Sequence, residues 1–194
     1  MAKGNSTGKS TDYLKTYQQT SAEIMQRIGH EEVAGFIDLL AAARENGQQI
    51  FLCGNGGSAA TASHFANDLG KGASWGRDKR FRVLALTDNI SWITALANDT
   101  DYAQIFVEQL KNYAHPQDLL VAFSGSGNSP NVLEAVKWAN NNGLITVGIT
   151  GRPGGDLGIM AQHPIYVESS HMGHIEEGHF LIQHLVGYYF MENE

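Results

Sequence analysis

The spacing of apolar residues changes along this chain, and the change predicts an α/β fold. Near the N-terminus the apolar residues recur with helical spacing, which predicts two helices. The first helix carries Tyr13, Tyr17, Ile24 and Ile28 on roughly one face, and the second carries Val33, Phe36, Ile37, Leu40 and Ala41. From residue 50 onward, short apolar runs alternate with further helical stretches. Strands that alternate with helices favour a parallel sheet with helices on both faces.

Five apolar runs predict the strands of this sheet, at residues 50–53, 81–86, 119–123, 145–149 and, more weakly, 164–167. The runs are almost wholly apolar rather than alternating, as expected of strands that are buried on both faces. Further helices are predicted at residues 58–69, at 90–110 with a break near 99, at 130–141, at or before 161, and at 175–191. The expected architecture has three layers, with the parallel sheet between two layers of helices.

The N-terminal residues 1–10 are polar and small, and we expect a disordered tail there, followed by a single domain over residues 11–194. Within this tail, the run Gly4–Ser10 superficially resembles a nucleotide-binding phosphate loop. It is one residue shorter than that motif requires and no strand precedes it, so a nucleotide site is not predicted.

The composition is that of a water-soluble protein. The 194 residues carry a net charge of -7, with 42% hydrophobic and 17% charged residues, which predicts neither a nucleic-acid nor a membrane partner. The one cysteine, Cys53, ends an apolar run, so we expect a buried structural thiol and a reducing compartment. The polar N-terminus lacks the apolar core of a secretion signal, and no stretch approaches the ~20 apolar residues of a membrane span. The expected location is the cytoplasm.

The loop after the first predicted strand carries a functional signal, because ligands bind at the carboxyl ends of parallel strands. It spans Gly54–Ala60, where glycines permit close backbone approach and Ser58 is placed to cap the next helix. Ala59 occupies the third glycine position of the dinucleotide fingerprint, and no acidic residue ends the second strand, so that motif is excluded. A glycine-rich turn without a ligand remains the alternative.

The loop after the third predicted strand contains three serines, Ser124, Ser126 and Ser129, before a helix that starts at Pro130. Three hydroxyls and the free backbone N–H groups of a helix start form a cradle for a phosphate without Lys or Arg. We therefore predict a phosphate site here, with a flexible Ser/Gly linker as the alternative. Arg152, in the turn after the fourth strand, is expected to be a solvated loop residue.

Three segments, in this order, resemble the sugar isomerase (SIS) domain, and most closely the phosphoheptose isomerases. They are Cys53–Ala60 with His64–Ala66, then Phe123–Ser129, then Ile175–His179 with His184. The resemblance extends over nearly all of the chain from about residue 12. It implies a flavodoxin-like fold with five parallel strands, in a homotetramer with active sites between subunits. It also implies an aldose–ketose isomerase that converts sedoheptulose 7-phosphate to D-glycero-D-manno-heptose 7-phosphate in heptose synthesis, as for lipopolysaccharide.

The resemblance further implies roles for particular residues. Substrate binding falls to Asn55, Gly56, Gly57, Ser58, Asn89, Ser124, Gly125, Ser126, Ser129 and Glu176. One zinc ion per site falls to His64, Asp68, Glu176 and His184. The chain departs from the family pattern where Asp68 replaces glutamate, Glu176 replaces glutamine, Asn89 replaces aspartate and Gly125 replaces threonine; Lys71 is the nearest candidate for a family arginine.

Helix geometry constrains this ligand set. His64 and Asp68 are one helical turn apart and share a face, which suits a divalent metal, although a solvated helix pair is the alternative. Glu176 and His184 are separated by roughly 12 Å along a continuous helix, which is too far for one ion. Either Glu176 lies at a frayed helix start, or the two side chains come from different subunits. The neighbouring His171, His174 and His179 are each expected to be structural or exposed.

Isomerisation through an enediol needs a base beside the carbonyl, a group that moves a proton between the two oxygens, and a stabiliser of the oxyanion. On this hypothesis Asp68 is the catalytic base, His184 is the acid/base partner, and zinc polarises the carbonyl. Two alternatives stay open: a non-catalytic SIS sensor or adaptor that binds a sugar phosphate, and an isomerase of a different sugar phosphate. Trp75 and Trp92 are expected to serve core or subunit packing rather than the sugar pocket.

Overall fold

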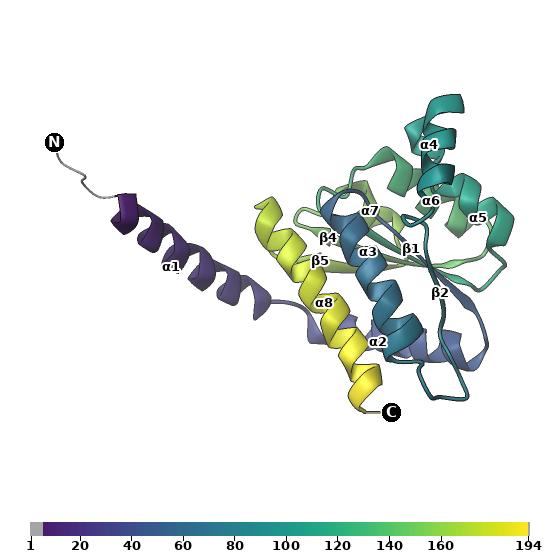
Figure 1. The fold of residues 1–194 in the computed structure, drawn as a ribbon, viewed down its shortest axis with the longest axis horizontal. Coiled ribbons are helices and arrows are strands. Elements are labelled where there is room, and N and C mark those ends of the chain that lie inside the picture. The colour runs from purple at the N-terminus through teal and green to yellow at the C-terminus, as the bar shows by residue number, and fades with distance from the viewer. Residues whose placement is uncertain (1–5, 194) are drawn as a thin grey trace.

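The structure is a computed structural model that describes residues 6–193. Helices α1 (Ser6–Met25) and α2 (His30–Glu45) confirm the two helices expected at the N-terminus, and α1 extends away from the rest of the molecule (Figure 1). Because α1 begins at Ser6, residues 6–10 are helical, and the expectation of a disordered tail was wrong there. A polar stretch can extend a helix that later residues have nucleated, since only the nucleus is costly. Residues 1–5 of the expected tail lie outside the described residues.

The sheet contains five parallel strands in the order β2-β1-β3-β4-β5, which confirms the predicted strands and their direction. The strands are β1 (Gln49–Cys53), β2 (Arg82–Ala85), β3 (Leu119–Ser124), β4 (Ile145–Gly151) and β5 (His163–Val167). In register, Ile50 of β1 lies beside Val83 on one side and Leu119 on the other. The carboxyl ends of β1, β3 and β4 therefore meet at one edge of the sheet.

Helices cover both faces of the sheet (Figure 1). The helices that follow α2 are α3 (Gly57–Asn67), α4 (Ile90–Asp99), α5 (Val107–Tyr113), α6 (Pro130–Asn141), α7 (Gly155–Met160) and α8 (Met172–Glu192). Helices α2, α3 and α8 pack on one face, and α5, α6 and α7 on the other. The helix expected at 58–69 is α-helical up to Asn67 and continues as a π-helical turn over Asp68–Gly72. The helix expected at 90–110 breaks after Asp99, as predicted.

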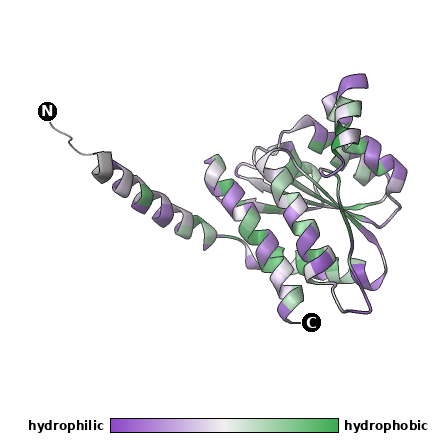
Figure 2. Ribbon diagram, in the orientation of Figure 1, coloured by the Kyte–Doolittle hydropathy of each residue, from purple (hydrophilic) through white to green (hydrophobic). Residues whose placement is uncertain are grey.

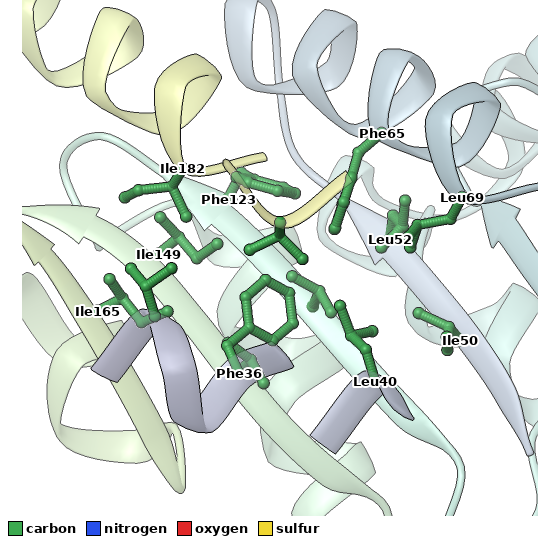
Figure 3. Close-up of a cluster of buried hydrophobic side chains, with 14 of the residues drawn as sticks. Phe36, Leu40, Ile50, Leu52, Phe65, Leu69, Phe123, Ile149, Ile165 and Ile182 are labelled. Carbon is green, nitrogen blue, oxygen red and sulfur yellow. The ribbon is translucent and has the colours of Figure 1, made fainter. Parts of the chain in front are cut away.

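The core lies on both faces of the sheet because successive strand residues point to opposite sides. Leu52 belongs to the cluster beneath α2, α3 and α8, which also contains Phe36 and Phe123 (Figure 3). Phe51 and Cys53 belong to the cluster on the other face. Cys53 is fully buried, and burial raises the pKa of its thiol to about 12, which confirms a structural cysteine.

Figure 2 shows apolar strands inside the molecule and polar residues along the outer faces of the helices. Within residues 6–193, none of the helices combines the length and the apolar character that crossing a membrane requires.

Two arginines near the amino ends of β1 and β2 stabilise helix ends. Arg77 donates hydrogen bonds to the carbonyl groups of Phe190 and Met191 in the last turn of α8. Arg82 donates to the carbonyl of Gly47, just beyond α2. Carbonyl groups at helix C-termini carry partial negative charge, so both guanidinium groups stabilise the ends of these helices.

Candidate functional site

The serine turn, residues 124–129, connects β3 to α6 at the carboxyl edge of the sheet. Ser124 is the buried last residue of β3, and its Oγ lies 3.3 Å from Ser129 Oγ. Ser129 is the N-cap of α6, but its side chain makes no capping hydrogen bond. Its hydroxyl therefore stays with that of Ser124 at a helix start, where backbone N–H groups attract anions.

A neighbouring turn holds the serine turn in place. Gly127 has a φ of 67°, and a Cβ added there would lie 1.9 Å from the carbonyl oxygen of Gly154, so only glycine fits. The backbone N–H of Leu157 donates to the carbonyl of Gly127 at 2.9 Å. The N–H of Asp156 donates to Asn128 Oδ1 at 3.0 Å. These contacts preorganise the cradle that the sequence predicts.

A cavity of about 270 Å³ lies between the serine turn and the loop after β1. Its walls are Asn55, Gly56, Gly57, Ser58, Phe123, Ser124, Gly125, Ser126, Ser129, Met172 and Glu176. None of these described wall residues is Lys or Arg, so hydroxyl and N–H groups supply its hydrogen-bond donors. The expectation that Ser58 caps α3 was wrong. Gly56, with a φ of 54°, turns the chain earlier and takes the N-cap position.

Glu176 joins this cavity to a second one. Its carboxylate packs on the backbone of Gly57, where an added Cβ would lie 2.7 Å from Oε1. The second cavity, of about 440 Å³, again has Gly57 and Glu176 in its wall and extends to Phe180 and His184. The hydroxyl-lined cradle and the second cavity therefore adjoin each other along α8.

Three candidate metal ligands converge beside the second cavity. Asp68 Oδ2 lies 3.3 Å from His64 Nε2 and 3.9 Å from His184 Nε2. The two Nε2 atoms are 3.2 Å apart, and all three ligand atoms lie within 4.8 Å of one another. His64 and Asp68 face the same way because they are one turn apart, and α8 packs against α3 and brings His184 to them.

The environment of Asp68 fits a metal ion. Its side chain is 8% exposed, compared with 41% for His64 and 34% for His184. Asp68 Oδ2 is buried and has no hydrogen-bond partner among the described residues. A buried carboxylate oxygen without a donor is destabilising, and coordination of a cation removes that cost. Two imidazoles and one carboxylate form the donor set of zinc sites that keep an open position.

Two residues predicted for the site do not join the groups that the sequence assigned them to. Helix α8 is continuous from Met172, so Glu176 is not at a frayed end, and it is not among the three described residues that converge. The arrangement with Glu176 at a frayed helix start is therefore wrong, and the arrangement with ligands from different subunits stays a prediction. Asn89 instead caps α4 by accepting from the N–H of Trp92 at 3.1 Å, and it lines a separate cavity of about 480 Å³.

Sequence reasoning missed the residue that holds Asn55. Asn55 Nδ2 donates to Asn131 Oδ1 at 2.8 Å, and Asn131 Nδ2 donates to Asn55 Oδ1 at 2.7 Å. The hydroxyl of Tyr102 donates to the same Asn55 oxygen at 3.2 Å. The one local signal is an asparagine directly after Pro130 at a helix start. Its partner lies 76 residues away, which no local pattern indicates.

The junction of α1 with α8 also went unpredicted. Ser21 Oγ donates to Glu177 Oε2 at 2.7 Å and lies 2.9 Å from His174 Nδ1. The Tyr17 ring lies 4.3 Å from the His174 ring. The pKa of Tyr17 is raised, and the hydrogen bond to Glu177 is the largest cause. Burial acts to raise the pKa of Glu177, but hydrogen bonds from Ser21, Tyr17 and His174 lower it.

Neither His179 nor Arg152 lies in the wall of the two cavities. His179 is fully buried, and burial lowers its pKa to about 4 against a smaller opposing effect of the Thr150 backbone. Gln183, one turn further along α8, is buried in the same way. Arg152 pairs with Glu168 at 2.7 Å, which confirms it as a surface loop residue.

Known proteins resemble this chain over most of its length. The family model for the SIS domain matches residues 12–151. The phosphoheptose isomerase of Campylobacter concisus is 38% identical over 177 residues, which cover 89% of this chain and 90% of that protein. The structure of a phosphoheptose isomerase from Neisseria gonorrhoeae matches with a TM-score of 0.85 and 30% identity, covering 93% of this chain and 97% of the other. That from Francisella tularensis matches with a TM-score of 0.85 and 28% identity, covering 98% and 100%.

Proposed function

This chain belongs to the SIS-domain family, among the phosphoheptose isomerases, and on that premise we propose that it converts sedoheptulose 7-phosphate to D-glycero-D-manno-heptose 7-phosphate through an enediol. One observation carries the proposal: the buried Oδ2 of Asp68, which makes no hydrogen bond in the described part of the chain, lies 3.3 and 3.9 Å from two imidazole nitrogens beside a hydroxyl-lined cradle. The fold alone hosts unrelated functions, whereas this constellation supplies acid/base chemistry next to an anion site.

The cradle is assigned to the phosphate of the substrate. Ser124, Ser126 and Ser129 offer hydroxyl donors, and the start of α6 adds backbone N–H groups. Asn55, Gly56, Gly57, Ser58 and Gly125 complete the wall that faces the bound ester. Glu176, which stands between the two cavities, is placed to contact the sugar. Asn89 as a substrate contact stays a prediction.

Proton transfer is assigned to two residues of the cluster. Asp68 takes a proton from the carbon beside the carbonyl and returns it to the neighbouring carbon, and His184 moves a proton between the two oxygens of the enediol. Zinc held by His64, Asp68 and His184, with Glu176 from another subunit, would polarise the carbonyl oxygen. Phe180 and Leu181 give the cavity in which these groups act an apolar wall.

The proposal includes a homotetramer in the cytoplasm with active sites between subunits. Helix α1 projects from the body of the molecule (Figure 1) and exposes Tyr13 and Leu14. Helix α8, which carries His184, exposes Phe180, Leu185 and Tyr188. Large apolar side chains that gather on two helices in this way are typical of subunit contacts.

The test is to incubate the purified protein with a panel of sugar phosphates, with and without added zinc, and to follow isomer formation by NMR. The proposal predicts zinc-dependent interconversion of the two heptose 7-phosphates. If the protein turns over another sugar phosphate in preference, the assigned substrate is wrong and the assigned reaction class stands. Binding of the whole panel without turnover would instead identify a sensor or adaptor.

A further inference from the structure

The side chain of Asn55 is engaged mostly by the protein itself. Its Oδ1 accepts hydrogen bonds from Asn131 Nδ2 at 2.7 Å and from the Tyr102 hydroxyl at 3.2 Å. Its Nδ2 donates one hydrogen bond, to Asn131 Oδ1 at 2.8 Å. An amide oxygen has two lone pairs, so Asn55 Oδ1 is saturated and Asn55 keeps one N–H for a ligand.

Asn131 is equally committed. It is 1% exposed, and its Oδ1 also accepts from the backbone N–H of Val132 at 3.0 Å. That N–H belongs to the first turn of α6, which begins at Pro130, directly after the serine turn that forms the phosphate cradle. The reciprocal amide pair thus joins the loop after β1 to the helix start that follows the serine turn. These are the two sides of the 270 Å³ cavity.

Tyr102 adds a third element to this connection. It lies in the short 3-10 helix Tyr102–Gln104, which Asp101 caps by accepting from the N–H of Ala103 at 2.7 Å. Its ring is exposed, so it contributes little to the core, but its hydroxyl reaches Asn55. A hydroxyl that an exposed tyrosine directs onto a saturated amide fixes that amide in one orientation.

We propose that Asn131 and Tyr102 are positioning residues, which hold Asn55 and the loop after β1 at the distance from the serine turn that a phosphate ester requires. The proposal deepens the isomerase assignment and rests on it for the identity of the ester. Since the pair acts on the width of the cavity, it affects ligand binding more than proton transfer, and KM rises more than kcat falls.

The test compares Asn131→Asp and Tyr102→Phe with the wild-type protein. Asn131→Asp keeps the shape and the acceptor but replaces the donor to Asn55 Oδ1 with an oxygen and adds a negative charge. Tyr102→Phe changes no charge, so weaker binding in that variant distinguishes lost positioning from charge repulsion. Tyr102→Phe removes one hydroxyl from an exposed ring. We expect inorganic phosphate, titrated by calorimetry, to bind about tenfold more weakly to the first and about fivefold more weakly to the second. Tyr113→Phe, another exposed tyrosine, is the matched control and binds phosphate as the wild type does.

Thermal unfolding and sugar-phosphate kinetics complete the test. A lower Tm with unchanged phosphate affinity and KM would show a merely structural amide pair and overturn the proposal. If Asn131→Asp fails to fold, unchanged phosphate affinity in Tyr102→Phe overturns it alone, and weakened affinity supports it. If the wild-type protein binds phosphate but isomerises no sugar phosphate, the isomerase assignment is wrong. The positioning role still holds in that case, provided that both variants bind phosphate more weakly as expected.

Discussion

His184 Nε2 lies 3.2 Å from His64 Nε2, although 120 residues separate them in the sequence. The two imidazoles come from α8 and α3, and both stand edge-on to the ring of Phe180. Imidazole nitrogens this close to each other and to a carboxylate form a set of metal ligands, and this arrangement is the basis of the first two predictions.

Asp68→Asn should abolish most turnover and spare phosphate binding. The amide keeps the size of the side chain but cannot take a proton, and loss of a positioned base costs about 10²–10⁴ in rate. His184→Ala should have a similar effect. Kinetics with the heptose phosphate and calorimetry with inorganic phosphate separate the two readouts. Glu108→Gln, at an exposed carboxylate paired with Lys111, is the control. Full activity in an Asp68 and His184 double variant would refute both roles.

Removal of bound metal should lower the thermal stability of the protein. A ligand that binds only the folded state stabilises it by about 2.7 kcal/mol at a hundredfold excess over its Kd. We therefore expect dialysis against a chelator to lower the Tm and added zinc to restore it. His64→Ala should remove the response to zinc, because one of three converging ligands is lost. A Tm that ignores both chelator and zinc in the wild-type protein would argue against a metal at this cluster.

The strands and the serine turn were predictable because their signals are local. A strand buried on both faces must be apolar at every position, as Leu119 to Phe123 are. A serine turn followed by Pro130 is typical of a helix start. The meeting of His64 with His184 depended on helix packing, and only the family resemblance suggested it.

Other features had no local signal. The partner of Asn55 is set by the three-dimensional distance between two loops, and the partner of Ser21 by the angle of α1 on α8. The cap of α3 was wrongly predicted at Ser58 from the capping propensity of serine. The positive φ of Gly56 turns the chain earlier, and the helix therefore begins before Ser58. Tertiary contacts decided each of these cases.

His179 should make the folded state less stable in acid. Its pKa is about 4 in the folded protein, below the ordinary 6.5, so the unfolded chain binds more protons between these values. Stability is therefore complete above pH 6.5 and falls as the pH drops toward 4, by about 3 kcal/mol from this group. His179→Leu should flatten that part of the profile, measured by urea unfolding at several pH values. An unchanged slope in the variant would show that other groups cause the acid sensitivity.

The junction of α1 with α8 should be visible in the titration of Tyr17. Since the hydrogen bond to Glu177 raises the pKa of this phenol, Glu177→Gln should return it toward 10. Ultraviolet difference titration measures the change, and Tyr17→Phe identifies which of the 7 tyrosines is responsible. Identical titration curves for the wild-type protein and Glu177→Gln would mean that α1 does not dock on α8 in solution.

Glu176→Gln should strengthen the binding of inorganic phosphate. The cradle has no Lys or Arg among its described wall residues, and Glu176 adds a negative charge to the same wall. Two like charges a few ångströms apart repel by about 1 kcal/mol even in water, so neutralisation should tighten binding about fivefold. The gain should shrink at high salt, because screening weakens the repulsion in the wild-type protein. Glu177→Gln, the next residue, removes an equal charge outside the cradle wall and should leave phosphate affinity unchanged. Weaker binding in Glu176→Gln would mean that the carboxylate supports the cradle, through its packing on Gly57 or a bound cation, more than it repels the phosphate.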